Sequence, residues 1–146
     1  NISLAQPKGG SNKFIDPREA NEHFKHRNFL WAMGVYKQLV KQEPENTEYN
    51  QKLGECYLNT NINKALAIPY LEKAMEKNKT DKIIVYELAL AYQYGSRFDD
   101  AIATYKVYMK SLTTPMDKAK IEHQIETCNN GKEMVKNPVN VTYKNL

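Results

Sequence analysis

Cysteine, tryptophan and long apolar runs are scarce in this sequence. Its 146 residues include two cysteines and one tryptophan, and no apolar run is long enough to cross a bilayer, so direct membrane insertion is not expected. Cys56 and Cys128 lie far apart, and neither has a second ligand at metal-like spacing. Both fall on apolar helical faces, which predicts two small buried side chains in place of a disulfide or a metal site.

An excess of charge of one sign is also lacking. The net charge is +4, and Lys and Glu are interspersed along the chain, as in Glu72-Lys73 and Glu76-Lys77. A nucleic-acid interface concentrates Lys and Arg on one face of the molecule. The interspersed pattern instead predicts solvated helix surfaces and no nucleic-acid partner.

What the sequence does contain is a repeated helical hairpin, clearest over residues 88–105. Two runs of helical period are separated there by a short polar turn through Gly95 and Ser96. Small residues in each run let two helix backbones approach, and aromatic residues beside them fill the gap. The same spacing occurs twice, at Ala20, Phe29, Ala32 and Tyr36 and again at Ala89, Phe98, Ala101 and Tyr105.

Residues 13–115 resemble tetratricopeptide (TPR) repeats, in which Leu-Gly or Leu-Ala, then Tyr, a turn, an aromatic and Ala recur. Leu53-Gly54 with Tyr57 and Leu88-Ala89 with Tyr92 carry the resemblance. It implies an all-α, right-handed TPR-type α-solenoid in which the repeated tyrosines lie in the core. The repeats implied are residues 13–46, 47–81 and 82–115, followed by a closing helix over about 115–135.

Capping residues predict where the helices begin. Asp16 with Pro17 marks the start of the first helix, and Thr114 followed by Pro115 and Asp117 repeats the same pattern. Asn46 or Thr47 is expected to cap the third helix, and Thr80 the fifth. Pro69 falls inside the second helix of the middle hairpin, where it predicts a mild kink or a late helix start.

The closing helix is expected to cover the end of the solenoid with one apolar stripe. Residues 129–131, Asn-Asn-Gly, are expected to fray it. The stripe consists of Ile121, Ile125, Cys128 and Val135.

Both termini are expected to lie outside the helical domain. Residues 1–12 contain Gly9-Gly10-Ser11 and predict a flexible segment, whose first six residues are compatible with the end of a secretory signal before cleavage. Residues 136–146 are predicted as an extended tail, since after Pro138 they alternate apolar and polar, a strand pattern. A strand without a sheet partner predicts that a β domain follows and that the chain is part of a longer protein.

A narrower resemblance concerns residues 67–74 and the 137–146 tail. Together with the repeats they look like the N-terminal part of Bacteroidetes envelope proteins, in which TPR repeats precede a WD40-like propeller and an OmpA-like domain and some members serve type IX secretion. This implies a periplasmic protein associated with the outer membrane that contacts peptidoglycan only through domains outside this chain. The alternative is a free-standing cytoplasmic TPR adaptor or co-chaperone-like protein.

The TPR resemblance also implies a groove that binds a protein or peptide. Amides in such a groove meet a peptide backbone, and tyrosines supply contact area at low entropic cost. Capture of a C-terminal carboxylate is not expected, because the basic positions that it needs in the third repeat hold Ile83 and Glu87. The groove candidates are Asn21, Lys25, Gln51, Glu55, Asn59, Tyr86, Leu90, Gln93 and Tyr94.

No catalytic residue, cofactor or metal site is predicted. The sequence has no nucleophile elbow, no glycine-rich phosphate loop and no carboxylate pair at a spacing that indicates shared acid–base work. His23 and His26, with Glu19 and Glu22 nearby, were the strongest candidates for metal ligands. In the repeat register His23 takes a core position and His26 the turn, so the two imidazoles do not converge.

Overall fold

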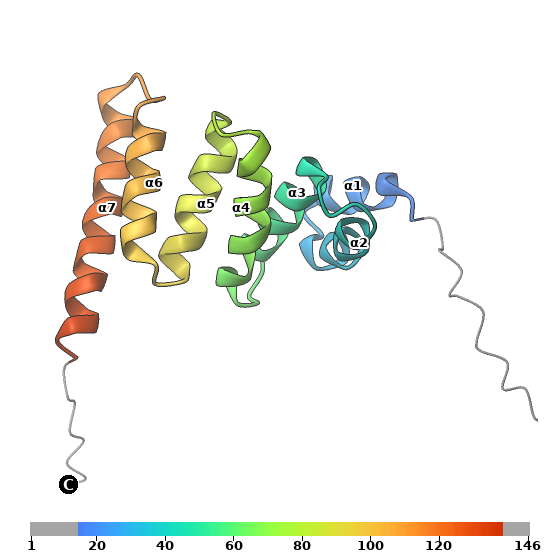
Figure 1. Ribbon diagram of the computed structural model, residues 1–146, viewed down its shortest axis with the longest axis horizontal. Coiled ribbons are helices and arrows are strands. Elements are labelled where there is room, and N and C mark those ends of the chain that lie inside the picture. The colour runs from blue at the N-terminus through green and yellow to red at the C-terminus, as the bar shows by residue number, and fades with distance from the viewer. Residues whose placement is uncertain (1–14, 139–146) are drawn as a thin grey trace, which may run out of the picture.

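The computed structural model describes residues 15–138, and all the regular structure in that range is helical (Figure 1). The all-α fold of three hairpins and a closing helix is therefore confirmed. The predicted flexible segment 1–12 and the strand pattern after Pro138 lie outside the described residues. The elements are α1 (Pro17–Lys25), α2 (Phe29–Gln42), α3 (Thr47–Leu58), the 3-10 helix η1 (Lys64–Ala67), α4 (Ile68–Lys77), α5 (Lys82–Tyr94), α6 (Phe98–Met109) and α7 (Pro115–Lys136).

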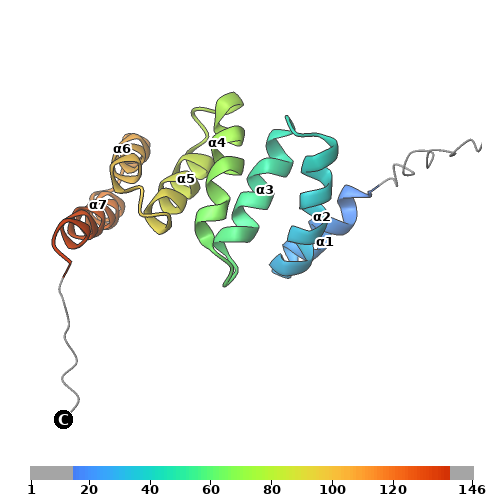
Figure 2. The same ribbon diagram turned by 60° about the horizontal axis from the view of Figure 1, so that its bottom comes forward.

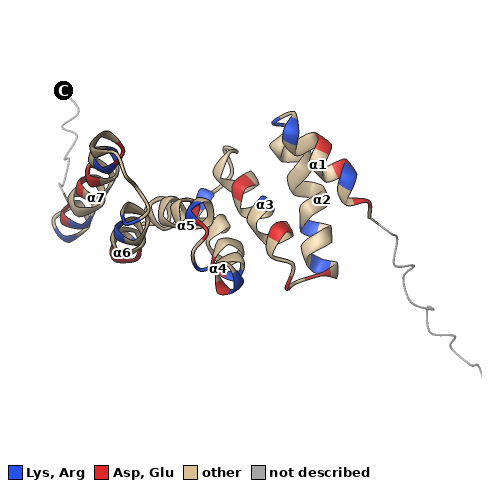
Figure 3. Cartoon of the chain, turned by 90° about the horizontal axis from the view of Figure 1, so that it is seen from above, with Lys and Arg blue, Asp and Glu red and all other residues tan. Residues whose placement is uncertain are grey.

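The helices stack in chain order along a curved array (Figure 2). Each hairpin packs its two helices together, α2 packs on α3, α4 on α5, and α7 on α6. Seen from above, α1, α3, α5 and α7 lie on the inner side of the arc, and α2, α4 and α6 lie on its outer side (Figure 3). The molecule thus has an inner and an outer surface, each built from alternate helices.

Small and aromatic residues form the core at the repeated positions. Ala89 and Ala101 are fully buried, and so are the rings of Tyr36 and Tyr105. Gly54 lies against Leu71, whose Cγ is 2.6 Å from where a Cβ would stand at residue 54. The glycine therefore permits a close contact between α3 and α4, as the repeat pattern predicts.

The two cysteines are buried free thiols, as predicted. Burial raises the pKa of Cys56 to about 12, and it also raises the pKa of Cys128. Neither thiol is therefore a reactive thiolate near neutral pH.

Most predicted helix starts are confirmed. The Asp16 side chain accepts a hydrogen bond from the backbone N–H of Arg18, and Asn46 accepts one from that of Tyr49. Thr114 accepts from the N–H of Asp117. The prediction for α5 is wrong, because its cap is Asp81, whose carboxylate accepts from Ile83 N at 2.9 Å, and Thr80 lies one residue too early to reach.

Pro69 is accommodated by a late start of α4. Residues 64–67 form the 3-10 helix η1, and α4 begins only at Ile68, which places Pro69 in its first turn. A proline is tolerated there because the first N–H groups of a helix have no partner within it. Of the two outcomes predicted, the late start is the one that occurs.

The closing helix has about the predicted bounds but is not frayed. It continues through residues 129–131 to Lys136, so the prediction of fraying is wrong. Gly131 makes room for the Phe98 ring, whose Cζ is 2.6 Å from where a Cβ would stand, and this packing holds the helix at that point. Val135 is 71% exposed and does not belong to the buried stripe, because α6 begins at Phe98 and offers nothing opposite the last turn of α7.

Candidate partner-binding groove

The inner surface is the structural counterpart of the predicted groove. Its walls are α1, α3, α5 and α7 (Figure 3). The predicted candidates lie on α1, α3 and α5, except Asn59, which caps the C-terminus of α3. Their local surroundings differ between the C-terminal, central and N-terminal parts of the arc.

The C-terminal part of the inner surface is hollowed between α5 and α7. A pocket of about 540 Å³ has Leu90, Gln93 and Tyr94 on its α5 side and Gln124 and Thr127 on its α7 side. The three α5 residues are predicted candidates. They come together because they lie within about one turn of each other at the end of α5.

A second pocket of about 580 Å³ continues the hollow toward the start of α5. Tyr86 lines it from α5, and Lys120 and Gln124 line it from α7. Gln124 borders both pockets, so the two adjoin along α5 and α7, and together they are called the trough. The Tyr86 ring packs against Tyr108 at 5.2 Å between centroids, which fixes its orientation along the wall.

The contribution of α7 is what sequence reasoning missed. The closing helix was predicted only to cover the core, and Gln124 and Thr127 were not among the candidates. A signal was present, since Gln124 lies within one turn of Ile121 and Cys128, both of which are buried against α6. A polar residue beside this buried stripe is expected to lie at the edge of the contact between α7 and α6, where a ligand can reach it.

The centre of the inner surface holds two carboxyl groups from neighbouring repeats. Glu55 on α3 and Glu87 on α5 are hydrogen-bonded to each other, and Gln51 Nε2 donates to Glu87 Oε2 at 3.4 Å. Glu87 is only 9% exposed. No sequence spacing pointed to this pair, because the stacking of α3 on α5 brings the two residues together.

Burial determines the protonation of this pair. Burial, and then the nearby charge of Glu55, raise the pKa of Glu87 to about 8. Burial also raises the pKa of Glu55, against the opposing effects of Lys52 and of the hydrogen bond from Glu87. A pKa of about 8 keeps Glu87 protonated at neutral pH, so its carboxyl group can donate a hydrogen bond to Glu55.

The N-terminal part of the inner surface is mostly occupied by contacts within the fold. Asn21 accepts a hydrogen bond from the Tyr36 hydroxyl at 2.6 Å. Lys25 is exposed and forms an ion pair with Glu22 at 2.8 Å. Asn59 donates to the Glu55 backbone carbonyl and borders a different pocket, near Trp31, so the structure does not join it to the trough.

Two predicted amides have their oxygen atoms engaged in the core and their nitrogen atoms free. The Tyr105 hydroxyl donates to Gln93 Oε1 at 2.7 Å, as Tyr36 does to Asn21. Within residues 15–138 neither amide nitrogen has a hydrogen-bond acceptor. Each amide is thus held in one orientation with its donor group available to a ligand.

The described residues contain neither a metal-binding cluster nor a membrane-spanning helix. Between Ile15 and Pro138, no three His, Cys, Asp or Glu side chains are placed to hold a metal ion together. In the same range, no helix is both long enough and apolar enough to span a membrane.

Comparisons with known proteins leave the family open. The sequence matches no protein-family model. It matches no curated protein. Among solved structures it is similar to the crystal structure of MamA protein, with 15% identity, a TM-score of 0.32, and coverage of 86% of this chain and 95% of that one. These values support no argument, so the description of the fold rests on the helices of this chain.

Proposed function

We propose that the chain is a non-catalytic protein–protein interaction scaffold that binds an extended polypeptide along the trough between α5 and α7. The observation that carries this proposal is the pair of adjoining pockets that share Gln124 as a lining residue. Tyr86 and Tyr94 supply aromatic area there, and Gln93 and Gln124 supply amide groups for a peptide backbone. This combination suits a chain in extended conformation better than a compact small molecule.

Site-specific photocrosslinking in the source cells tests the proposal. A photoreactive residue at Gln124 is expected to capture a polypeptide partner, because this position borders both pockets. The matched control is the same residue at Lys106, which is exposed on α6, a helix of the outer surface. Adding Tyr86→Ala to the Gln124 probe is expected to weaken capture. Equal capture from both positions, or none from Gln124, contradicts binding in the trough.

We also propose a cellular setting for this scaffold, as the TPR module of a larger periplasmic protein that is associated with the outer membrane and peptidoglycan and serves a secretion system. Its support is the likeness of residues 67–74 and 137–146 to Bacteroidetes envelope proteins. An antibody against the domain, used on fractionated cells, is expected to detect a band several times larger than 16.9 kDa in the envelope fraction. A cytoplasmic band near 16.9 kDa would instead identify a free-standing adaptor.

A further inference from the structure

The outer surface of the first hairpin exposes large apolar side chains. Leu30 is 64% exposed and Trp31, the single tryptophan of the sequence, is 71% exposed. Both border a pocket of about 550 Å³ between the start of α2 and the loop after α3, where Ile62 is also exposed. A partly hollowed apolar surface around a tryptophan has the composition of a binding hot spot.

The fold itself does not require these apolar residues. The corresponding positions of the third hairpin hold Asp99 and Asp100, at the start of α6. Acidic residues suit the first turn of a helix, because its N–H groups carry partial positive charge. Leu30 and Trp31 lack that benefit, and among residues 15–138 they stay mostly exposed, although one face of the Trp31 ring stacks on His23 at 5.8 Å between centroids.

Gly34, one turn further along α2, is not required by any contact within residues 15–138. The other described glycines, Gly54, Gly95 and Gly131, each lie against a packed side chain of another helix. A Cβ at Gly34 meets nothing within 4 Å, although glycine inside a helix is costly. Glycine at such an open helical position allows another backbone to approach closely.

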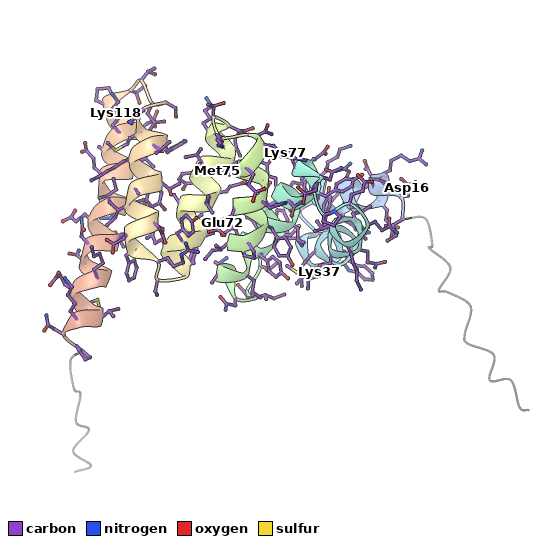
Figure 4. All side chains as sticks on the ribbon, in the orientation of Figure 1. Asp16, Lys37, Glu72, Met75, Lys77 and Lys118 are labelled. Atoms are coloured by element: carbon purple, nitrogen blue, oxygen red, sulfur yellow. The ribbon has the colours of Figure 1, made fainter. Side chains whose placement is uncertain are left out.

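The charge of the same face is of one sign. Lys37 and Lys41 are exposed, and the helix from residue 29 to 42 contains no Asp or Glu (Figure 3). Figure 4 shows the Lys37 side chain on α2. Its Nζ lies 5.3 Å from the centroid of the Tyr57 ring. Within residues 15–138 no carboxylate forms an ion pair with Lys37, Lys41 or Arg27.

We propose that this outer face of α2 docks an acidic amphipathic helix of a partner protein. Apolar side chains of that helix cover Leu30 and Trp31, its backbone passes close over Gly34, and its carboxylates meet Lys37 and Lys41. From Trp31 to Lys41 the face is about 15 Å long, which is the length of a three-turn helix. A helix that presents apolar anchors one turn apart is the ligand that such a face recognises.

A second copy of this chain fits the face poorly. Contact between two α2 helices would bring together two surfaces that carry lysine and no carboxylate. The proposal is also independent of binding in the trough, since the trough lies on the inner surface and α2 on the outer one (Figure 3).

A phage-displayed library of single helices with randomised outward positions tests this inference on the full chain. Selected helices are expected to carry net negative charge and an apolar stripe. Their affinity is expected to fall by about tenfold or more with Trp31→Ala, Gly34→Leu or Lys37→Glu. The matched control is Ala103→Leu, at the exposed position of α6 that corresponds to Gly34, and it is expected to leave binding unchanged.

The emission of Trp31 reports on the face directly, because no other tryptophan contributes to it. Binding of a selected helix is expected to shift the emission to the blue. The inference is overturned if no helix is selected, if the selected helices lack an excess of Asp and Glu, or if they bind Trp31→Ala and Gly34→Leu as they bind the parent. It is also overturned if only phosphatidylserine vesicles shift the emission, or if sedimentation shows that Trp31→Ala dissolves a homodimer.

Discussion

At the scale of single residues, Glu87 shows how burial changes a side chain. The position looks like any charged helix residue in the sequence, yet in the structure it is enclosed between α3 and α5 and hydrogen-bonded to Glu55. Burial keeps it protonated at neutral pH. The contact between these two repeats thus includes a carboxyl group, that of Glu87, which is protonated at neutral pH.

This proton makes stability depend on pH. The pKa of Glu87 is about 8 in the folded chain against an ordinary value of 4.5, so between these values the folded state binds more protons than the unfolded state. The free energy of unfolding is therefore expected to fall as pH rises from about 4.5 to 8, by on the order of 2–4 kcal/mol from this group. Urea unfolding across this range measures the fall.

Glu87→Gln is the control for this prediction. It keeps a neutral side chain of similar shape and removes the titration, so the variant is expected to lose less stability than the parent as pH rises. A parent and variant with parallel pH dependence would show that Glu87 ionises normally in the folded chain.

A second prediction at the residue scale concerns Ala101. It is fully buried where α5 and α6 pack together, so Ala101→Leu is expected to overpack the contact and cost about 1–3 kcal/mol of stability. Ala103→Leu adds the same atoms at an exposed position of the same helix and is expected to change stability by less than about 0.5 kcal/mol. Thermal melting of both variants measures the difference, and equal midpoints would show that the repeat register is wrong.

At the scale of the elements, individual side chains decide where a helix begins and how far it continues. Asp81, not Thr80, caps the N-terminus of α5. In α7, the Phe98 ring packs against Gly131, where the helix continues without a break. The chain's own packing therefore overrides the local weakness of the Asn-Asn-Gly segment. Helix propensity alone did not foresee this, because the stabilising ring comes from a different helix.

Two glycines inside helices are expected to respond in opposite ways to substitution by alanine. Gly34→Ala is expected to stabilise the fold by about 0.5–1 kcal/mol, because its new methyl group meets only open space. Gly131→Ala places a Cβ within 3 Å of the Phe98 ring and is expected to destabilise by about 1–2 kcal/mol despite better helix propensity. Chemical denaturation measures both, and stabilisation by both substitutions would show that the ring moves aside freely.

At the scale of the whole molecule, α7 serves two purposes. It covers the end of the array through Ile121 and Cys128, which are buried against the third hairpin, and it forms one wall of the trough. Its opposite face carries polar residues such as Glu122, Glu126 and Glu133, which remain in solvent. A repeat array needs such a polar outer face at its end to stay soluble.

Truncation before Pro115 is therefore expected to do more than shorten the array. Loss of α7 exposes the apolar side of α6, so a lower melting midpoint, a tendency to aggregate and loss of any ligand of the trough are expected together. Truncation after Pro138 is the control, since it keeps every described helix and is expected to preserve the melting midpoint within about 2 °C. A stable, monomeric product without α7 would contradict the capping role.

The sequence by itself determined the hairpins, their core of alanines and tyrosines and most helix starts, because these follow from short-range spacing and local hydrogen bonds. Only the tertiary structure decided the rest. Stacking of whole repeats joined Glu55 to Glu87 and placed Gln124 opposite Tyr86. Within residues 15–138 it left Trp31 mostly exposed beside His23 and left open space around Gly34. Contacts between helices far apart in sequence have no local pattern, so their positions follow only from how the hairpins pack.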